Sequence, residues 1–164
     1  MINLCGEATA IDSLCHLILT KKFKSANISI PNPYMQNSSI DLLISNKKSI
    51  KCDMFFVNNS PFINIDIDID ARILSSDSEL QNLNDQNLKT LEKSINLFLE
   101  DILNEYLYKT SLDFNSDVCG FGKYAITKFL ETKDWDNYNW LESYKNSIFN
   151  VNVNSTIISG LLLM

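Results

Sequence analysis

The sequence predicts an α+β domain, in which a predominantly antiparallel sheet of about four to five strands packs against one long helix and several shorter ones. Residues 62–72 alternate apolar and polar side chains, as a half-buried strand does, whereas apolar residues after Asp85 recur every three to four positions, as in a helix. The 164-residue chain is 45% hydrophobic and has only four glycines and three prolines. It therefore has enough apolar residues for one core, and we place a single domain over residues 1–164.

The N-terminal part of the chain predicts one helix and one short strand. A helix from Thr9 to Lys22 is indicated by apolar side chains at three-to-four spacing, which are Ile11, Leu14, Cys15 and Ile18. Residues 27–30 form a short strand that Pro31-Asn32-Pro33 ends, because proline removes a donor from the strand ladder.

The next three apolar segments predict strands. Residues 40–44 and 49–56 flank the polar run Asn46-Lys47-Lys48, which is typical of an antiparallel hairpin with a short loop. Residues 62–72 then place isoleucines on one face and polar side chains on the other. The first set is Ile63, Ile65, Ile67 and Ile69, and the second is Asn64, Asp66, Asp68 and Asp70. We expect this strand to have one buried face and one wet face.

A long amphipathic helix of about six turns is predicted to begin near Asp85, with Asn84 or Asp85 as its cap. Its apolar stripe comprises Leu88, Leu91, Ile95, Phe98, Leu99, Ile102 and Tyr106, and this stripe is expected to pack on the sheet. The opposite side of the helix carries Lys89, Glu92, Lys93, Asn96 and Glu100.

The last third of the chain predicts two more helices and a closing strand. A third helix starts near Asp117 and runs to Phe129, and a fourth covers residues 140–148. The closing strand spans residues 149–158, with Val151 and Val153 directed inward and the intervening asparagines directed outward.

Charge and cysteine spacing exclude several function classes. The net charge is −6 and Arg72 is the single arginine, whereas a nucleic-acid-binding surface needs clustered Lys and Arg, so we expect no nucleic-acid partner. The cysteines, at positions 5, 15, 52 and 119, form no Cys-x-x-Cys pair, so the sequence favours buried free thiols over a zinc ribbon. No window of about 18 apolar residues predicts a membrane span.

The aspartates of residues 66–70 are the candidate cation ligands, because calcium prefers carboxylate oxygens. Same-face side chains on one strand lie about 7 Å apart, however, and the ligands of one ion must converge. We therefore interpret Asp66, Asp68 and Asp70 as a solvated strand face, paired with Lys51 or another cross-strand lysine. His16 is the only histidine, and on a helix its side chain points about 100° away from that of its neighbour Cys15. We therefore expect a structural role for His16. We predict no catalytic residues.

The segment from Asp117 to Tyr124 contains Gly120-Phe121-Gly122, which could start a phosphate-binding helix. It lacks a third glycine and a preceding apolar strand, so we favour a structural role in which Asp117 caps the helix and the glycines allow close packing. Trp135 and Trp140 belong to an aromatic cluster that is either part of the core or an interaction hot spot. Trp135 stands in a polar run and is the one we expect to be exposed.

The order of these C-terminal features resembles the C-terminal domain of the spore germinant-receptor C subunits, the Ger(x)C family. The resemblance rests on Asp117, Gly120, Phe121, Gly122 and Tyr124, followed by the tryptophan-bearing segment, the Val151 and Val153 strand and a terminal Gly-Leu. Two departures stand out: residues 128–131 lack a proline, and residues 155–159 replace a basic run.

The resemblance implies a non-enzymatic role, without a cofactor, in nutrient-triggered spore germination. Members of the family act with integral-membrane A and B subunits. They are lipoproteins held by a lipid anchor at the outer face of the spore inner membrane, so this chain is expected to be the terminal domain of a longer lipoprotein. The alternative is a module that binds a small germinant or a cation directly, and a third hypothesis is a small hydrolase that uses His16.

Overall fold

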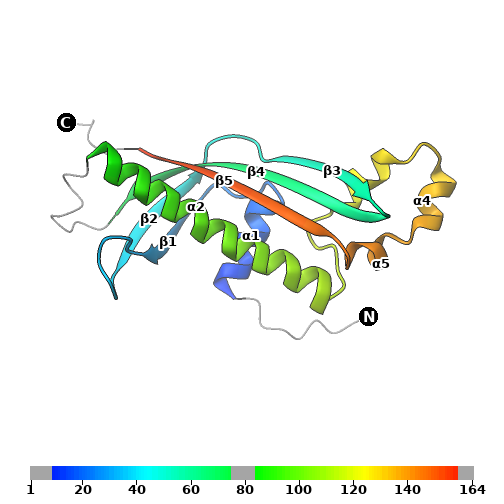
Figure 1. Cartoon of the computed structure of the whole chain (residues 1–164), viewed down its shortest axis with the longest axis horizontal. Coiled ribbons are helices and arrows are strands. Elements are labelled where there is room, and N and C mark those ends of the chain that lie inside the picture. Colours follow the sequence, from blue (N-terminus) through cyan, green and yellow to red (C-terminus); the bar gives the residue numbers. More distant parts are fainter. Residues whose placement is uncertain (1–8, 75–83, 159–164) are drawn as a thin grey trace.

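The computed structural model describes residues 9–74 and 84–158, which form two layers. A five-stranded sheet makes one layer, and helices α1 (Ala10–Leu19) and α2 (Asp85–Tyr108) lie together on one of its faces (Figure 1). Residues that alternate toward the other face are mostly exposed or half-buried. The predicted α+β class is confirmed, including the long helix.

Helix α1 begins where the sequence supplies a cap. The backbone N–H of Asp12 donates to Thr9 Oγ1, and the backbone N–H of Thr9 donates to Asp12 Oδ2, each over 3.0 Å. This reciprocal capping box satisfies two donors that the first helical turn leaves free. The helix ends at Leu19, three residues before the predicted end, because Lys21 adopts a left-handed conformation with φ of 61°.

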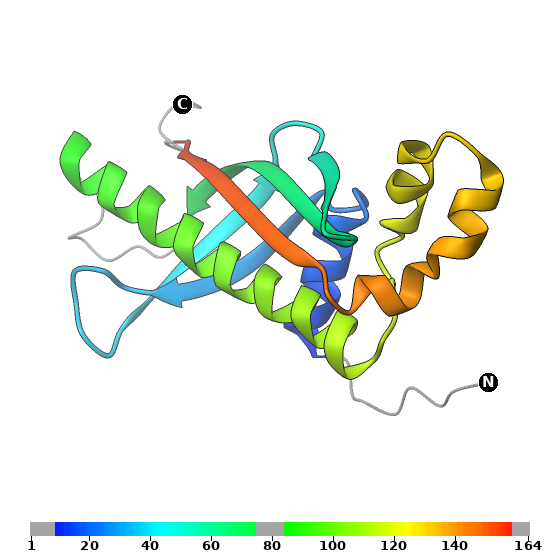
Figure 2. The ribbon, with the colours of Figure 1, turned by 45° about the vertical axis from the view of Figure 1, so that its right-hand side comes forward.

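The sheet is antiparallel except for one pair of strands. Its strands are β1 (Ser25–Pro31), β2 (Ser39–Asn46), β3 (Lys51–Val57), β4 (Ser60–Ile73) and β5 (Ile148–Ile157). β1 pairs with β2, and β3 pairs with β4 through the two-residue turn Asn58-Asn59, whose φ angles of 49° and 67° suit a hairpin. β5 pairs with β4 in parallel, after the long connection that contains α2 (Figure 2).

The predicted hairpin between residues 40–44 and 49–56 is wrong. Both β2 and β3 pair with β4, at Ile69–Ile73 and Ser60–Asp66 respectively, on the edge opposite β5. The two strands therefore run end to end in the same direction, and the polar run 46–48 belongs to the break between them. β4 has 14 residues, which is long enough to pair with five residues of β2, Leu42–Asn46, and with all seven of β3 in turn.

The core lies between the sheet and α2. All four isoleucines predicted for the buried face of β4 are at most 2% exposed, and Val151 and Val153 of β5 are buried beside them. α2 begins at Asp85 with Asn84 as its cap, as predicted, and Asn84 Oδ1 accepts from the N–H of Asn87 over 2.8 Å. Its buried side chains are Leu91, Ile95, Leu99, Leu103, Tyr106 and Leu107.

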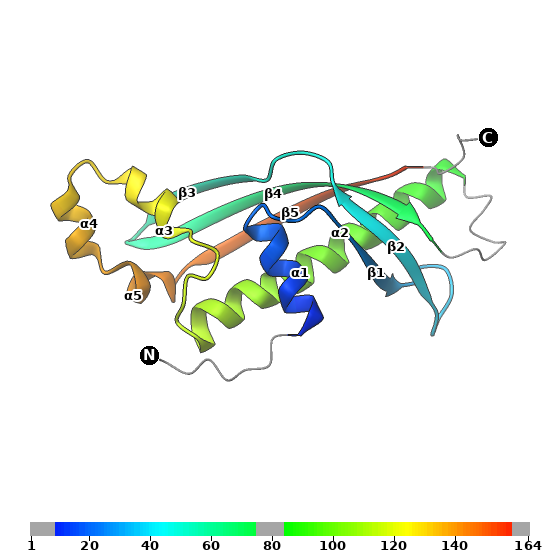
Figure 3. The ribbon, with the colours of Figure 1, turned by 180° about the vertical axis from the view of Figure 1, so that it is seen from behind.

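The C-terminal helices are shorter than predicted. They are α3 (Gly122–Ala125), continued by a 3₁₀ turn at Ile126–Lys128, then α4 (Thr132–Tyr138) and α5 (Trp140–Tyr144). Gly120 has φ of 78°, which delays the third helix, and Phe129 is extended, which ends it. Asn139, with φ of 49°, separates α4 from α5, and Ile148 already belongs to β5. These helices project from one end of the sheet (Figure 3).

Candidate functional site

The open face of the sheet carries an ordered ladder of polar side chains. β4 and β5 pair in register, so Asn64, Asp66 and Asp68 of β4 each stand beside an outward asparagine of β5. Side-chain amides donate across the pair, from Asn150 to Asn64 over 3.1 Å, from Asn152 to Asp66 over 3.2 Å and from Asn154 to Asp68 over 3.3 Å. These amide donors occupy carboxylate oxygens that a cation would require.

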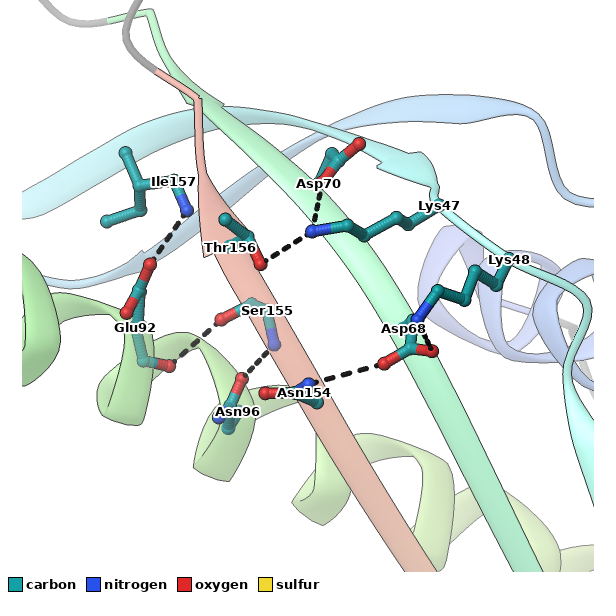
Figure 4. Close-up of polar contacts among 10 residues, drawn as sticks. All are labelled: Lys47, Lys48, Asp68, Asp70, Glu92, Asn96, Asn154, Ser155, Thr156 and Ile157. Atoms are coloured by element: carbon teal, nitrogen blue, oxygen red, sulfur yellow. Dashed lines mark hydrogen bonds and ion pairs between the residues drawn. The ribbon is translucent and has the colours of Figure 1, made fainter.

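Lysines from the break between β2 and β3 occupy the other side of the ladder. Lys48 Nζ lies 3.5 Å from Asp68, and Lys47 Nζ lies 3.3 Å from Asp70 while it donates to Thr156 Oγ1 over 2.9 Å (Figure 4). The Asn154 hydrogen bond, followed by the charge of Lys48, lowers the pKa of Asp68. Within residues 9–74 and 84–158, no group of three or more His, Cys, Asp and Glu side chains is placed to hold a metal ion.

Three acceptors on α2 satisfy the free edge of β5. Glu100 Oε1 accepts from the N–H of Val153 over 2.9 Å, and Asn96 Oδ1 accepts from the N–H of Ser155 over 2.8 Å. Glu92 Oε1 likewise accepts from the N–H of Ile157 over 2.9 Å (Figure 4). A helix rises about 6 Å over four residues and a strand about 6.6 Å over two, so acceptors at i, i+4 and i+8 match alternate strand donors. The same spacing is also that of an ordinary solvated helix face, so the sequence alone does not single these residues out.

Asp117 organises the segment that carries the family resemblance. Its carboxylate accepts from the backbone N–H groups of Phe121 and Gly122, over 2.8 and 2.6 Å, and from Trp140 Nε1 over 3.0 Å. A Cβ on Gly122 would lie 3.0 Å from Trp140 Nε1, so glycine allows the indole to approach. Phe121 is buried and Tyr124 is half-buried.

The projecting helices enclose a chain of aromatic rings, and we call residues 126–144 the aromatic lobe. Phe129 contacts Trp135 at 5.5 Å between ring centroids, Trp135 contacts Trp140 at 6.0 Å, and Trp140 contacts Tyr144 at 5.3 Å. Both tryptophans are half-buried against the core. Leu130, by contrast, is 99% exposed.

Three thiols of the described residues are further candidate nucleophiles; Cys15 is buried, and Cys52 and Cys119 are half-buried. Desolvation raises the pKa of Cys15 and of Cys119 to about 12, and that of Cys52 to about 11, so these side chains stay protonated near neutral pH. His16 Nδ1 lies 3.2 Å from the hydroxyl of Tyr106, on the neighbouring helix α2. This contact gives His16 a packing partner in the domain.

Together these features define a two-layer α+β domain with one helix-covered sheet face, one polar sheet face and a projecting aromatic lobe. A family model described as "Spore germination B3/ GerAC like, C-terminal" matches residues 3–160, so the chain belongs to this family. The resemblance inferred from the sequence is therefore confirmed. The family gives the chain a role in spore germination, as a domain of a germinant-receptor C subunit.

A solved structure has a similar fold. The chain resembles "Crystal Structure of the GerBC protein" with a TM-score of 0.73 and 14% sequence identity. The match covers 92% of this chain and 46% of that one, so the chain spans less than half of the solved protein. A search of curated proteins found no match. No helix within residues 9–74 and 84–158 has both the length and the apolarity that a membrane span requires.

Proposed function

We propose that this domain is a non-catalytic assembly module of a spore germinant receptor. It acts with the integral-membrane A and B subunits, as part of a lipoprotein at the outer face of the spore inner membrane. The family match over residues 3–160 is the observation that carries the proposal.

The chemistry of the domain favours assembly over catalysis. The thiols of Cys52 and Cys119 have pKa values raised to about 11 and 12, so neither is a ready nucleophile. Asp117, which a hydrolase could use, accepts three hydrogen bonds from the domain itself. The alternative of cation binding by the strand carboxylates is disfavoured, because Asp66 and Asp68 already accept hydrogen bonds from asparagines.

The aromatic lobe is the surface that we assign to the membrane subunits. Leu130 is 99% exposed. Ile126 and Leu141, which belong to the same lobe, are 44% and 45% exposed. Trp135 and Trp140, in the same lobe, pack against each other and against the core. Trp and Tyr are enriched in interface hot spots, and the nearly complete exposure of Leu130 leaves an apolar side chain that a partner could bury.

The test is a pull-down of the tagged full-length protein from spore membranes, with Leu130→Asp in the lobe and Leu97→Asp on α2 as the matched control. Leu97 is 51% exposed, so both changes place a carboxylate at an exposed leucine. We expect wild type and Leu97→Asp to recover the A and B subunits, and Leu130→Asp to recover at least about tenfold less, the worth of one buried leucine. Recovery of neither subunit by the wild type would refute the assembly role, and equal recovery by both variants would refute the lobe as its surface.

A further inference from the structure

A cleft of about 340 Å³ opens between the C-terminal end of α1 and the segment 117–124. Residues 16 and 19–22, at the end of α1 and just after it, line one side of the cleft, and residues of the segment 117–124 line the other. Ile50, Cys52 and Ile65 contribute from the sheet. The volume falls within the range of small-molecule sites, about 300–1,000 Å³.

The rim of this cleft is cationic, although the chain has a net charge of −6. Lys21, Lys22 and Lys123 all line it, and none of the three forms an ion pair within the described part of the chain. The lining includes one carboxylate, that of Asp117, and this group already accepts from two backbone N–H groups and an indole. Three lysine charges therefore share the cleft with one carboxylate, which is already hydrogen-bonded to the domain, so the cleft has an excess of positive charge.

The backbone holds Lys21 at the rim in a conformation that lysine disfavours. The N–H of Lys21 donates to Ile18 O and the N–H of Lys22 to Leu17 O, both over 3.0 Å, which is the Schellman ending of a helix. Glycine is preferred at the left-handed position of this motif, yet Lys21 occupies it with φ of 61°. Its ammonium lies 5.6 Å from the ring centroid of Tyr124, on the opposite wall of the cleft.

The opposite wall contributes a second ammonium through a different local device. Gly120 has φ of 78°, and the side chain of Lys123 packs beside it, with Lys123 Nζ 3.9 Å from where a Cβ would be. Apolar side chains line the rest of the cleft: Leu19, Ile50, Ile65, Val118 and Phe121. A ligand that fits both parts has an anionic group for the lysines and a compact apolar body.

We propose that this cleft binds a small organic carboxylate, with Lys21 and Lys123 as the anion-binding residues. Lysine and carboxylate form charge-assisted hydrogen bonds, which are about twice as strong as neutral ones. The apolar lining then selects a carboxylate with an apolar body over an inorganic anion. Receptor assembly is not needed for this binding, so a failed pull-down and a failed ligand titration are separate results.

The test is an NMR titration of the 164-residue chain with benzoate, with benzamide as the uncharged isostere and inorganic phosphate as the anion without an apolar body. We expect benzoate, at up to about 20 mM, to shift the amide signals of residues 20–22 and 117–124, since ligands of this size bind in the millimolar range. Benzamide and phosphate are expected to bind at least about tenfold more weakly. Equal shifts from benzamide would overturn the anionic site, and equal affinity for phosphate would overturn the organic carboxylate.

Two variants separate binding from folding. Lys21→Gly removes the ammonium and places glycine at the left-handed position, so we expect the fold to be retained and benzoate affinity to fall at least about tenfold. Lys123→Met is expected to weaken binding by a similar factor. The control Lys48→Met removes the same charge from the outer face of the sheet, where Lys48 pairs with Asp68, and should leave the affinity unchanged. Equal loss in all three variants would show general charge attraction and overturn the proposed site.

Discussion

Replacing Asn96 tests whether α2 stabilises the sheet by capping the edge of β5. Asn96 Oδ1 is the acceptor for the N–H of Ser155, over 2.8 Å, and Ser155 is only 5% exposed. Asn96→Leu keeps a side chain of similar size but leaves that buried N–H without its partner, which costs about 1–3 kcal/mol of unfolding free energy. The better helix propensity of leucine returns up to about 0.5 kcal/mol.

The expected net loss is therefore about 0.5–3 kcal/mol, or about 1–12 °C in Tm for a chain of this size. Urea denaturation gives the free energy, and amide hydrogen exchange at Ser155 tests the location, because the freed N–H should exchange faster than in the wild type. We also expect the uncapped edge to promote self-association, which gel filtration would detect.

The matched control is Asn96→Asp, which keeps an acceptor oxygen at the same position. It adds a charge four residues from both Glu92 and Glu100, so it is best measured at about 0.5 M salt, where such repulsion is screened. We expect this variant to stay close to the wild type. If Asn96→Leu were as stable as Asn96→Asp, the hydrogen bond to Ser155 would contribute nothing and the edge-capping argument would fail.

Two other changes test the segment after Asp117 and the start of α1. Gly122→Ala places a Cβ 3.0 Å from Trp140 Nε1, so we expect a loss of about 1–3 kcal/mol in urea denaturation and altered tryptophan fluorescence. Gly120→Ala is strained by the φ of 78° and should lose about 1–2 kcal/mol, but its Cβ meets only the side chain of Lys123, at 3.8 Å, so it should leave the tryptophan fluorescence unchanged. Identical spectra for both variants would contradict this account. The hydrogen bond from Lys109 Nζ, followed by that from the N–H of Thr9, lowers the pKa of Asp12 below 3.8. Its stabilising effect is present above the unfolded pKa and is lost as pH falls through the folded value, so Asp12→Asn should lose less stability than the wild type between about pH 4 and pH 2. Parallel pH profiles of unfolding free energy for the two proteins would disprove this.

Hydrophobic periodicity alone was sufficient to predict the strand and the helix whose apolar residues follow a single regular repeat. β4 shows four isoleucines at alternate positions, and all four are buried, because a period of two leaves the strand only one face to bury. α2 was predicted from its first residue, because the stripe beginning at Leu88 follows a strong cap at Asn84.

Strand pairing could not be predicted in the same way, because a local pattern does not identify the partner. Polar residues 46–48 between two apolar runs are compatible with a hairpin and equally with a break in one long edge pairing. The length of β4 decides between them, since both β2 and β3 fit along it. The predicted start of the third helix, near Asp117, was wrong because Gly120 adopts a left-handed conformation. Glycine permits this conformation, but the sequence does not specify it.

The polar side of α2 was the least predictable part. Glu92, Asn96 and Glu100 have the spacing of a solvated helix face, yet they accept hydrogen bonds from the edge of β5. A helix propensity pattern cannot distinguish water from an unpaired strand edge as the donor. The cleft was hidden for a related reason, because its walls come from segments about a hundred residues apart, and no local motif contains both Lys21 and Lys123.

Asp117 connects the cleft to the aromatic lobe through a single carboxylate. Oδ1 accepts from the N–H of Phe121, which lines the cleft, and Oδ2 accepts from both the N–H of Gly122 and the indole of Trp140. The segment 117–124 has two states to compare, one with Trp140 hydrogen-bonded to Asp117 and one without that bond. A ligand in the cleft can affect the lobe only if its affinity for these two states differs. A Cβ placed on Gly122 would lie 3.0 Å from Trp140 Nε1, so this part of the segment and the indole are closely packed. Asp117 is therefore hydrogen-bonded both to the segment that lines the proposed cleft and to a tryptophan of the proposed partner surface, so a ligand that displaces Phe121 or Gly122 is expected to perturb the hydrogen bond of Trp140.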